Sequence, residues 1–105
     1  MVNLSSSFQL VSIFAAGDLG YFCHRVPGVA SISGALLVFV ESRIGSCDDQ
    51  APKDVNMRHS LDGGLSWSSP TRVLGHGPDS RSNFTFRNPY PTVVGERVVL
   101  NGQLD

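Results

Sequence analysis

The chain has 105 residues, the length of one small domain, with 41% apolar and 16% charged residues, a balance that favours a globular chain over a disordered one. The net charge of −1 and the lack of a basic run argue against nucleic acid or an anionic membrane surface as partner. No run of about 18 apolar residues is present, so no membrane span is expected.

Short apolar segments separated by glycine and proline predict strands and tight turns rather than helices. The expected strands are residues 9–14, 28–32, 35–41, 55–60, 71–74, 92–94 and 97–100. Residues 35–40 are apolar at every position, which is typical of a strand buried on both faces. A buried helix is the alternative, but the shortness of the run and the preceding Gly34 favour the strand.

The two cysteines, Cys23 and Cys47, are too few to define a disulfide framework and lack the close pairing of a zinc site. We favour ordinary thiols and leave a Cys23–Cys47 pairing open. The histidines His24, His59 and His76 share no short spacing, so no metal site is expected, and no cofactor is expected either.

Two N-glycosylation sequons occur, at residues 3–5 (NLS) and 83–85 (NFT). They would be used only in a secretory context, and such triplets often arise by chance. The sequence therefore leaves the cellular compartment open.

Residues 60–67 (SLDGGLSW) fit the pattern S-x-D-x-G-x-[ST]-W at every defined position. The aspartate, Asp62, can accept hydrogen bonds from backbone N–H groups of a tight turn, while Gly64 supplies a positive φ and Trp67 buries a large face. We interpret Ser60, Asp62, Gly64 and Trp67 as a folding device between two strands, not as a ligand site.

Four further segments flank this octet in a fixed order: residues 20–29 (GYFCHRVPGV), 34–43 (GALLVFVESR), 45–55 (GSCDDQAPKDV) and 87–94 (RNPYPTVV). Together they resemble the sialidase (neuraminidase) family, whose Asp-box the octet resembles, over about residues 11–95. The resemblance implies an all-β fold comprising the first blade and the start of the second of a six-bladed β-propeller. Residues 1–10 would be an N-terminal segment and 11–105 the N-terminal portion of the propeller domain, and we expect the chain to be truncated.

The resemblance implies roles for two arginines. Arg25 matches one of three family arginines that hold the substrate carboxylate, a task that suits the planar guanidinium fork. Arg43 matches an arginine on the floor of the pocket, and Glu41 is expected to orient a neighbouring arginine.

The family's general acid/base is an aspartate in the loop after that second arginine, where Asp48 and Asp49 stand together. Counting back from Asp54 by the family spacing favours Asp49, and Asp48 stays the alternative. Asp54 itself is interpreted as structural.

The implied activity is that of an exo-α-sialidase, a glycoside hydrolase that removes terminal sialic acids from glycoproteins, gangliosides and oligosaccharides by a retaining mechanism with a tyrosine nucleophile. That tyrosine, its partner glutamate and the other two arginines are expected from later blades, so we expect the 105 residues alone to be inactive. The alternative is a non-catalytic Asp-box propeller that binds carbohydrate or another partner. These residues do not distinguish hydrolysis from transfer of the sialic acid to an acceptor.

Overall fold

The computed structural model describes residues 9–80 and 83–105. A short 3₁₀ turn, η1 (Asp18–Gly20), precedes the strands. The strands are β1 (Cys23–Ile32), β2 (Ala35–Arg43), β3 (Lys53–Ser60), β4 (Thr71–Leu74), β5 (Phe86–Val94) and β6 (Arg97–Leu104).

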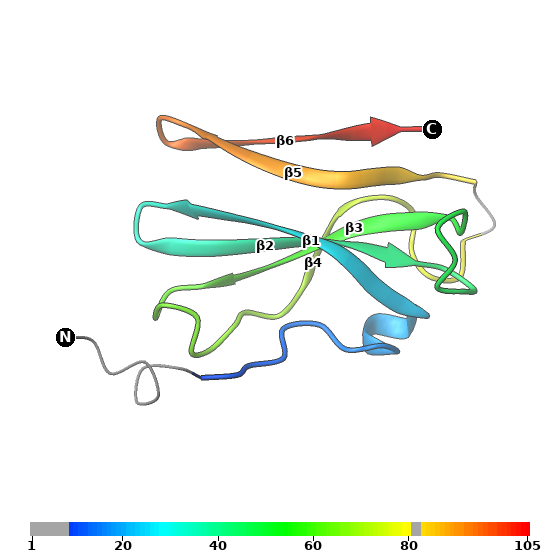
Figure 1. Cartoon of the computed structure of the whole chain (residues 1–105), viewed down its shortest axis with the longest axis horizontal. Helices are drawn as coiled ribbons and strands as arrows, with labels where there is room; N and C mark the ends of the chain where they lie inside the picture. Colours follow the sequence, from blue (N-terminus) through cyan, green and yellow to red (C-terminus); the bar gives the residue numbers. More distant parts are fainter. Residues whose placement is uncertain (1–8, 81–82) are drawn as a thin grey trace.

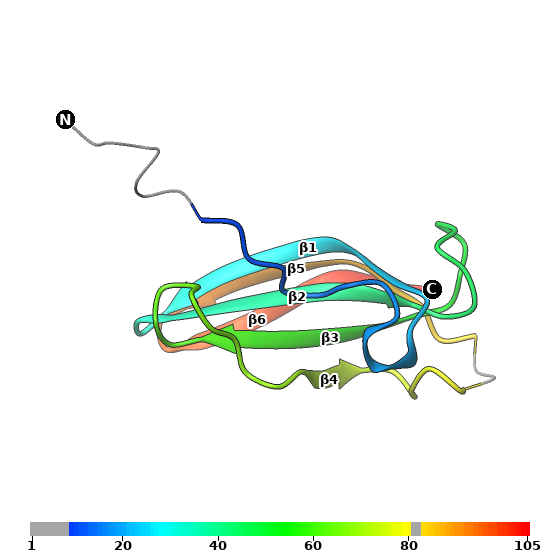
Figure 2. The same cartoon turned by 90° about the horizontal axis from the view of Figure 1, so that it is seen from below.

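The strands form two antiparallel sheets, one with the order β1-β2-β3-β4 and one consisting of β5 and β6 (Figure 1). The β5–β6 hairpin lies along the first sheet, with β5 against β1 (Figures 1 and 2). Four antiparallel strands are the content of one propeller blade. The expected all-β class is confirmed.

Tight turns close the β1–β2 and β5–β6 hairpins. Ser33 and Gly34 join β1 to β2 with φ of 49° and 82°, the pair of positive values that a two-residue hairpin turn of type I′ requires. Gly95 begins the β5–β6 turn with φ of 61°. Both turns direct the chain straight back and set the registers Ile32↔Ala35 and Val94↔Arg97.

The centre of β2 is buried on both faces, as its apolar run predicts, with Val38, Phe39 and Val40 each 4% exposed. The core changes character toward the end of β2 and the start of β3, where the buried side chains are polar or charged. These residues are Glu41, Ser42, Arg43, Lys53, Asp54 and Asn56. Buried charges of this kind require partners, and the partners define the candidate site.

Strands β1 and β5 are longer than the sequence predicts because each passes through proline at a bulge. The register of β1 shifts between Arg25 and Gly28, and that of β5 shifts between Arg87 and Tyr90. A bulge lets a strand continue past a residue that has no N–H to donate.

The prediction of a strand at residues 9–14 is wrong, because this segment is irregular and joins neither sheet. The expectation of ordinary thiols is also wrong, since Cys23 and Cys47 form a disulfide. The sequon at residues 3–5 and most of the segment 1–10 lie outside the described residues.

Candidate functional site

The Asp-box forms a closed hydrogen-bond network at the end of β3. The Asp62 carboxylate accepts bonds from Ser60 Oγ (2.8 Å), Ser66 N (2.9 Å) and Ser66 Oγ (2.5 Å). These donors lower the pKa of Asp62 to about 2, because they stabilise the ionised form. Each oxygen of the carboxylate is thus used within the turn.

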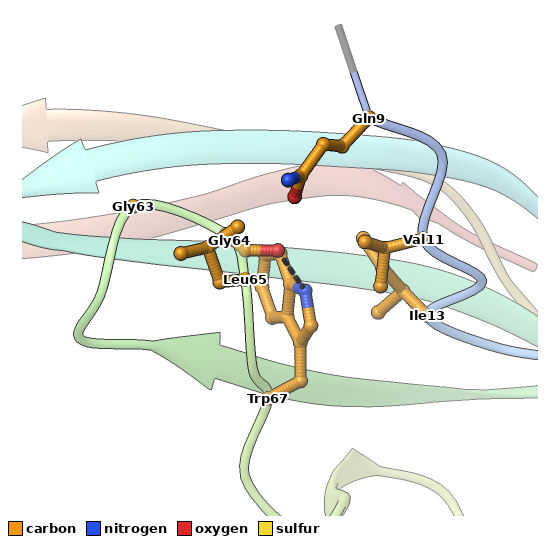
Figure 3. A pocket seen from close by; sticks show the side chains of 7 residues that line it. All are labelled: Gln9, Val11, Ile13, Gly63, Gly64, Leu65 and Trp67. Carbon is orange, nitrogen blue, oxygen red and sulfur yellow. Dashed lines mark hydrogen bonds between the residues drawn. The ribbon is translucent and has the colours of Figure 1, made fainter. Parts of the chain in front are cut away.

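Trp67 completes the same turn by donating its indole N–H to Gly64 O at 3.0 Å (Figure 3). Gly64 adopts a φ of 97°, which a side chain would disfavour. An open cavity of about 470 Å³ separates this turn from the N-terminal segment, lined by Gln9, Val11, Ile13, Gly63, Gly64, Leu65 and Trp67.

A second cavity, of about 350 Å³, lies at the opposite end of β3 and is lined by two of the candidate residues, Arg43 and Asp49. We call it the Arg43 cavity; its lining residues are Val26, Glu41, Arg43, Asp49, Gln50, Arg87 and Asn88. β3 has eight residues, so strand geometry separates the two ends by roughly 20 Å. The Asp-box therefore does not contribute to this cavity.

Arg43 is the buried centre of the cavity, with 3% of its surface exposed. Its Nη2 donates to Glu41 Oε1 at 2.9 Å, and its Nη1 donates to Asp49 Oδ1 at 2.9 Å and to Cys47 O at 2.7 Å. Burial acts to lower the pKa of Arg43. The carboxylates of Glu41 and Asp49 stabilise its charged form more strongly, so its pKa is raised overall. Glu41 thus orients Arg43, as expected from the sequence.

The loop between β2 and β3 brings Asp49, and not Asp48, to Arg43. The Asp49 side chain is 83% exposed although one oxygen is paired with the guanidinium. Asp48 Oδ1 instead accepts the backbone N–H of Gln50 at 2.8 Å, an Asx turn that shapes the loop. Only Asp49 of the two lines the Arg43 cavity.

Two further interactions fix this loop. The disulfide joins Cys47, two residues before Asp49, to Cys23 at the start of β1. Lys53 is completely buried, and its Nζ donates to Asp49 O at 2.8 Å and Ala51 O at 2.7 Å. Burial, with the nearby positive charges of Arg87 and Arg43, lowers the pKa of Lys53.

Arg25 stands across from Glu41 in the β1–β2 register, and the next residue, Val26, lines the Arg43 cavity. Arg25 itself borders a neighbouring hollow of about 230 Å³ that includes Val38 and Val40. Its side chain is exposed and makes no hydrogen bond or ion pair with another described residue. The structure thus brings Arg43 and Asp49 together and leaves Arg25 beside them, unpaired.

The sequence does not assign roles to Arg87 and Asn88, which the structure places in the cavity. Arg87 donates to Asp49 O at 2.9 Å and is ion-paired with Asp105, while the N–H of Asn88 donates to Glu41 Oε2 at 2.7 Å. Glu41 therefore links Arg43 on one sheet to the backbone of the other. The sequence signal for these residues is their place at the start of the segment 87–94, which resembles the family without assigning a role to either of them.

The two bulges meet at this cavity. Val26 has a φ of 56° and Asn88 a φ of 53°, and both residues line the cavity. A positive φ is an outlier for a β-branched residue such as Val26, and strained backbone of this kind concentrates at functional sites.

Asp54 has the structural role expected of it. Its carboxylate accepts the Tyr21 hydroxyl at 2.6 Å and the backbone N–H groups of His76 (3.2 Å) and Gly77 (2.8 Å). Burial, together with the Asp54 carboxylate, raises the pKa of Tyr21. A Cβ at Gly75 would collide with the same carboxylate, so glycine is required there.

Within residues 9–80 and 83–105, no group of three or more His, Cys, Asp and Glu side chains is placed to hold a metal ion. In the same residues no helix is long and apolar enough to cross a membrane.

No known family profile matches the chain, and no curated protein matches it. A search of solved structures finds similarity to a mutant of Trypanosoma rangeli sialidase that displays trans-sialidase activity, with a TM-score of 0.66 and 17% sequence identity. The match covers 77% of this chain and 13% of that protein, so the chain spans a small part of its length. At this identity the likeness concerns the fold: the chain has the all-β fold of part of a sialidase.

Proposed function

We propose that this chain forms part of the substrate site of an exo-α-sialidase, a glycoside hydrolase that releases terminal sialic acids from glycoproteins, gangliosides and oligosaccharides. The observation that supports this most is the Arg43 cavity, where a buried, oriented arginine meets an exposed carboxylate. The fold likeness to a sialidase supports the same class.

Arg25 would bind the carboxylate of the sialic acid. An exposed guanidinium without a protein partner can offer its planar fork to a ligand carboxylate through two parallel charged hydrogen bonds. Arg43, already held by Glu41 and Asp49, would form the floor beneath the sugar ring.

Asp49 would act as general acid and then as general base. One of its oxygens is held by Arg43, while the other makes no hydrogen bond to another described residue and can reach a glycosidic oxygen. A substrate carboxylate nearby would favour the protonated form that a general acid needs. The proton would pass to the leaving oxygen as the glycosidic bond breaks.

The retaining mechanism further requires a tyrosine nucleophile with its partner glutamate and two more arginines for the carboxylate. The proposal places these groups on other blades of a larger propeller, and it assigns none of them to Tyr21 or Tyr90.

The test is an assay of the protein that contains these residues together with the remaining blades, using a fluorogenic sialoside. We expect Asp49→Ala to lower kcat by about 10²–10⁴-fold, the usual contribution of a general acid. The matched control is Asp48→Asn, one residue away, which keeps the oxygen that accepts the Gln50 N–H and should retain most of the activity.

Arg25→Ala should mainly raise KM, and Arg25→Lys should recover part of the loss because it restores charge without the fork. If the wild-type protein binds sialosides but never cleaves them, the chain belongs to a carbohydrate-binding module instead. Equal losses in Asp48→Asn and Asp49→Ala would overturn the assignment of the acid.

A further inference from the structure

The sequon at residues 83–85 lies in the connection between β4 and β5, within the described part of the chain. The side chain of Asn83 is exposed to solvent. Its neighbours are anchored: the Phe84 ring lies edge-on to His76 with centroids 5.5 Å apart, and Thr85 is 7% exposed. Asn83 is therefore exposed to solvent directly before two anchored residues.

The disulfide between Cys23 and Cys47 is an independent indication of the compartment in which the chain matures. Structural disulfides persist in the secretory pathway and outside the cell, and are rare in the reducing cytosol. The secretory pathway is also where Asn-x-Ser/Thr sequons with x other than proline are glycosylated. The disulfide thus indicates the compartment in which an exposed sequon asparagine such as Asn83 is modified.

We propose that Asn83 carries an N-linked glycan. The side-chain amide nitrogen of Asn83 forms a bond to the anomeric carbon of a lipid-diphosphate-linked oligosaccharide. The bond between that carbon and the diphosphate oxygen breaks, the lipid diphosphate leaves, and the amide nitrogen loses one proton. No oxidant or reductant takes part.

The glycan would lie at the same end of the molecule as the loop that carries Asp49 (Figure 1). The backbone connects the two regions directly, since Lys53 N donates to Phe84 O at 3.2 Å. This modification is independent of the proposed hydrolase activity, because it requires only the sequon and the compartment.

The decisive measurement is mass spectrometry of the protein purified from its own cells. Trypsin cleaves after Arg81 and Arg87, so Asn83 is recovered in the peptide 82–87, which contains no other asparagine. We expect this peptide only after treatment with peptide-N-glycosidase, which converts Asn83 to aspartate. An unmodified peptide 82–87 as the main species overturns the proposal.

A second experiment tests whether Asn83 is an acceptor in the folded chain. The chain is directed to the secretory pathway of eukaryotic cells with Asn3→Gln in every variant, and both the secreted and the membrane-enclosed fractions are analysed. Thr85→Ser should keep the glycan, while Thr85→Val, which fills the same buried space, should lose it. Retention of glycan in Thr85→Val, or its absence in Thr85→Ser, contradicts the assignment.

A peptide map of the native protein without reduction tests whether the chain matures in an oxidising compartment. We expect Cys23 and Cys47 in one disulfide-linked peptide pair. Recovery of both as free thiols would overturn the proposal even if the heterologous chain is glycosylated.

Discussion

Asp62 offers the clearest pH dependence among single residues. Its pKa is lowered to about 2, from 3.8, by Ser66 and Ser60. Because the folded pKa lies below the unfolded one, the stabilisation is complete above about pH 4 and is lost as the pH falls toward 2. We expect Asp62→Asn to be less stable at pH 7 and to lack this part of the acid-induced decline.

Urea unfolding at several pH values between 2 and 7 measures this difference. Asp79→Asn serves as control, since Asp79 is an exposed loop aspartate. If Asp62→Asn loses stability with acid as steeply as the wild type, the hydrogen bonds in the Asp-box do not hold the carboxylate as described.

Lys53 is a residue whose role cannot be read from the sequence. A lysine before a strand suggests only a surface charge, yet here its ammonium is buried beneath the loop that carries Asp49. Burial depends on two backbone carbonyls, of Asp49 and Ala51, in the nine-residue loop 44–52. The pattern of side chains alone does not encode this tertiary arrangement. The lining residues Arg87 and Asn88 are missed for the same reason, because they arrive from another sheet.

Replacing Lys53 with methionine should loosen the loop while keeping similar volume. Hydrogen bonds to charged groups contribute about 1.5–3 kcal/mol, so local opening should become on the order of tenfold more frequent or greater. Hydrogen exchange at the Ala51 amide, which donates to Asp48 O at 3.0 Å, reports this opening. Arg97→Met is the control on the exposed β6, and equal exchange at Ala51 in both variants would contradict the role.

At the scale of elements, the sequence predicts strands well where no proline interrupts them. The strand at residues 71–74 has the predicted bounds, and the buried run at 35–41 falls within β2. The first halves of β1 and β5 are not predicted from the sequence because they contain prolines at positions 27, 89 and 91. The bulges that accommodate these prolines depend on the register of each strand with its neighbour. Residues 9–14 fail for the opposite reason: their apolar pattern fits a strand, but no strand within residues 9–80 and 83–105 pairs with them.

The disulfide ties β1 to the loop of Asp49 across 24 residues of chain. Chain-entropy arguments for a loop of this length give roughly 3–4 kcal/mol of stabilisation. We expect Cys23→Ala/Cys47→Ala to lower the free energy of unfolding by about that amount in urea titrations. The wild type should lose the same stability on addition of a dithiol, whereas the double variant should not respond; a response in both would assign the effect to something else.

Gly28 sets the distance between the two sheets. A Cβ at this position would clash with the carbonyl oxygen of Pro89 and the ring of Pro91, so β1 and β5 could not approach as closely. Overpacking of this kind costs about 1–3 kcal/mol, and we expect Gly28→Ala to shift the urea midpoint accordingly. Val29→Ala, at the adjacent exposed position, is the control; a stable Gly28→Ala would mean that the sheets are not held at this contact.

For the whole molecule, several large apolar side chains of the two sheets remain exposed to solvent. Large apolar side chains are exposed along β1, β5 and β6: Val29, Tyr90, Val93, Val94, Val99 and Leu104. In the described structure β6 pairs with β5 alone, so its other edge presents unpaired backbone groups. Both features favour contact with further β-structure.

We therefore expect the 105-residue chain, studied on its own, to self-associate as its concentration rises. Sedimentation velocity across a concentration series should show growing weight-average mass, and an environment-sensitive hydrophobic dye should bind. Lysine on the edge strand opposes edge-to-edge pairing, so Val99→Lys/Leu104→Lys should stay monomeric while keeping the β-sheet circular dichroism of the wild type. A wild-type chain that remains monomeric at high concentration without binding the dye would show that the exposed apolar side chains and the free edge of β6 do not drive association.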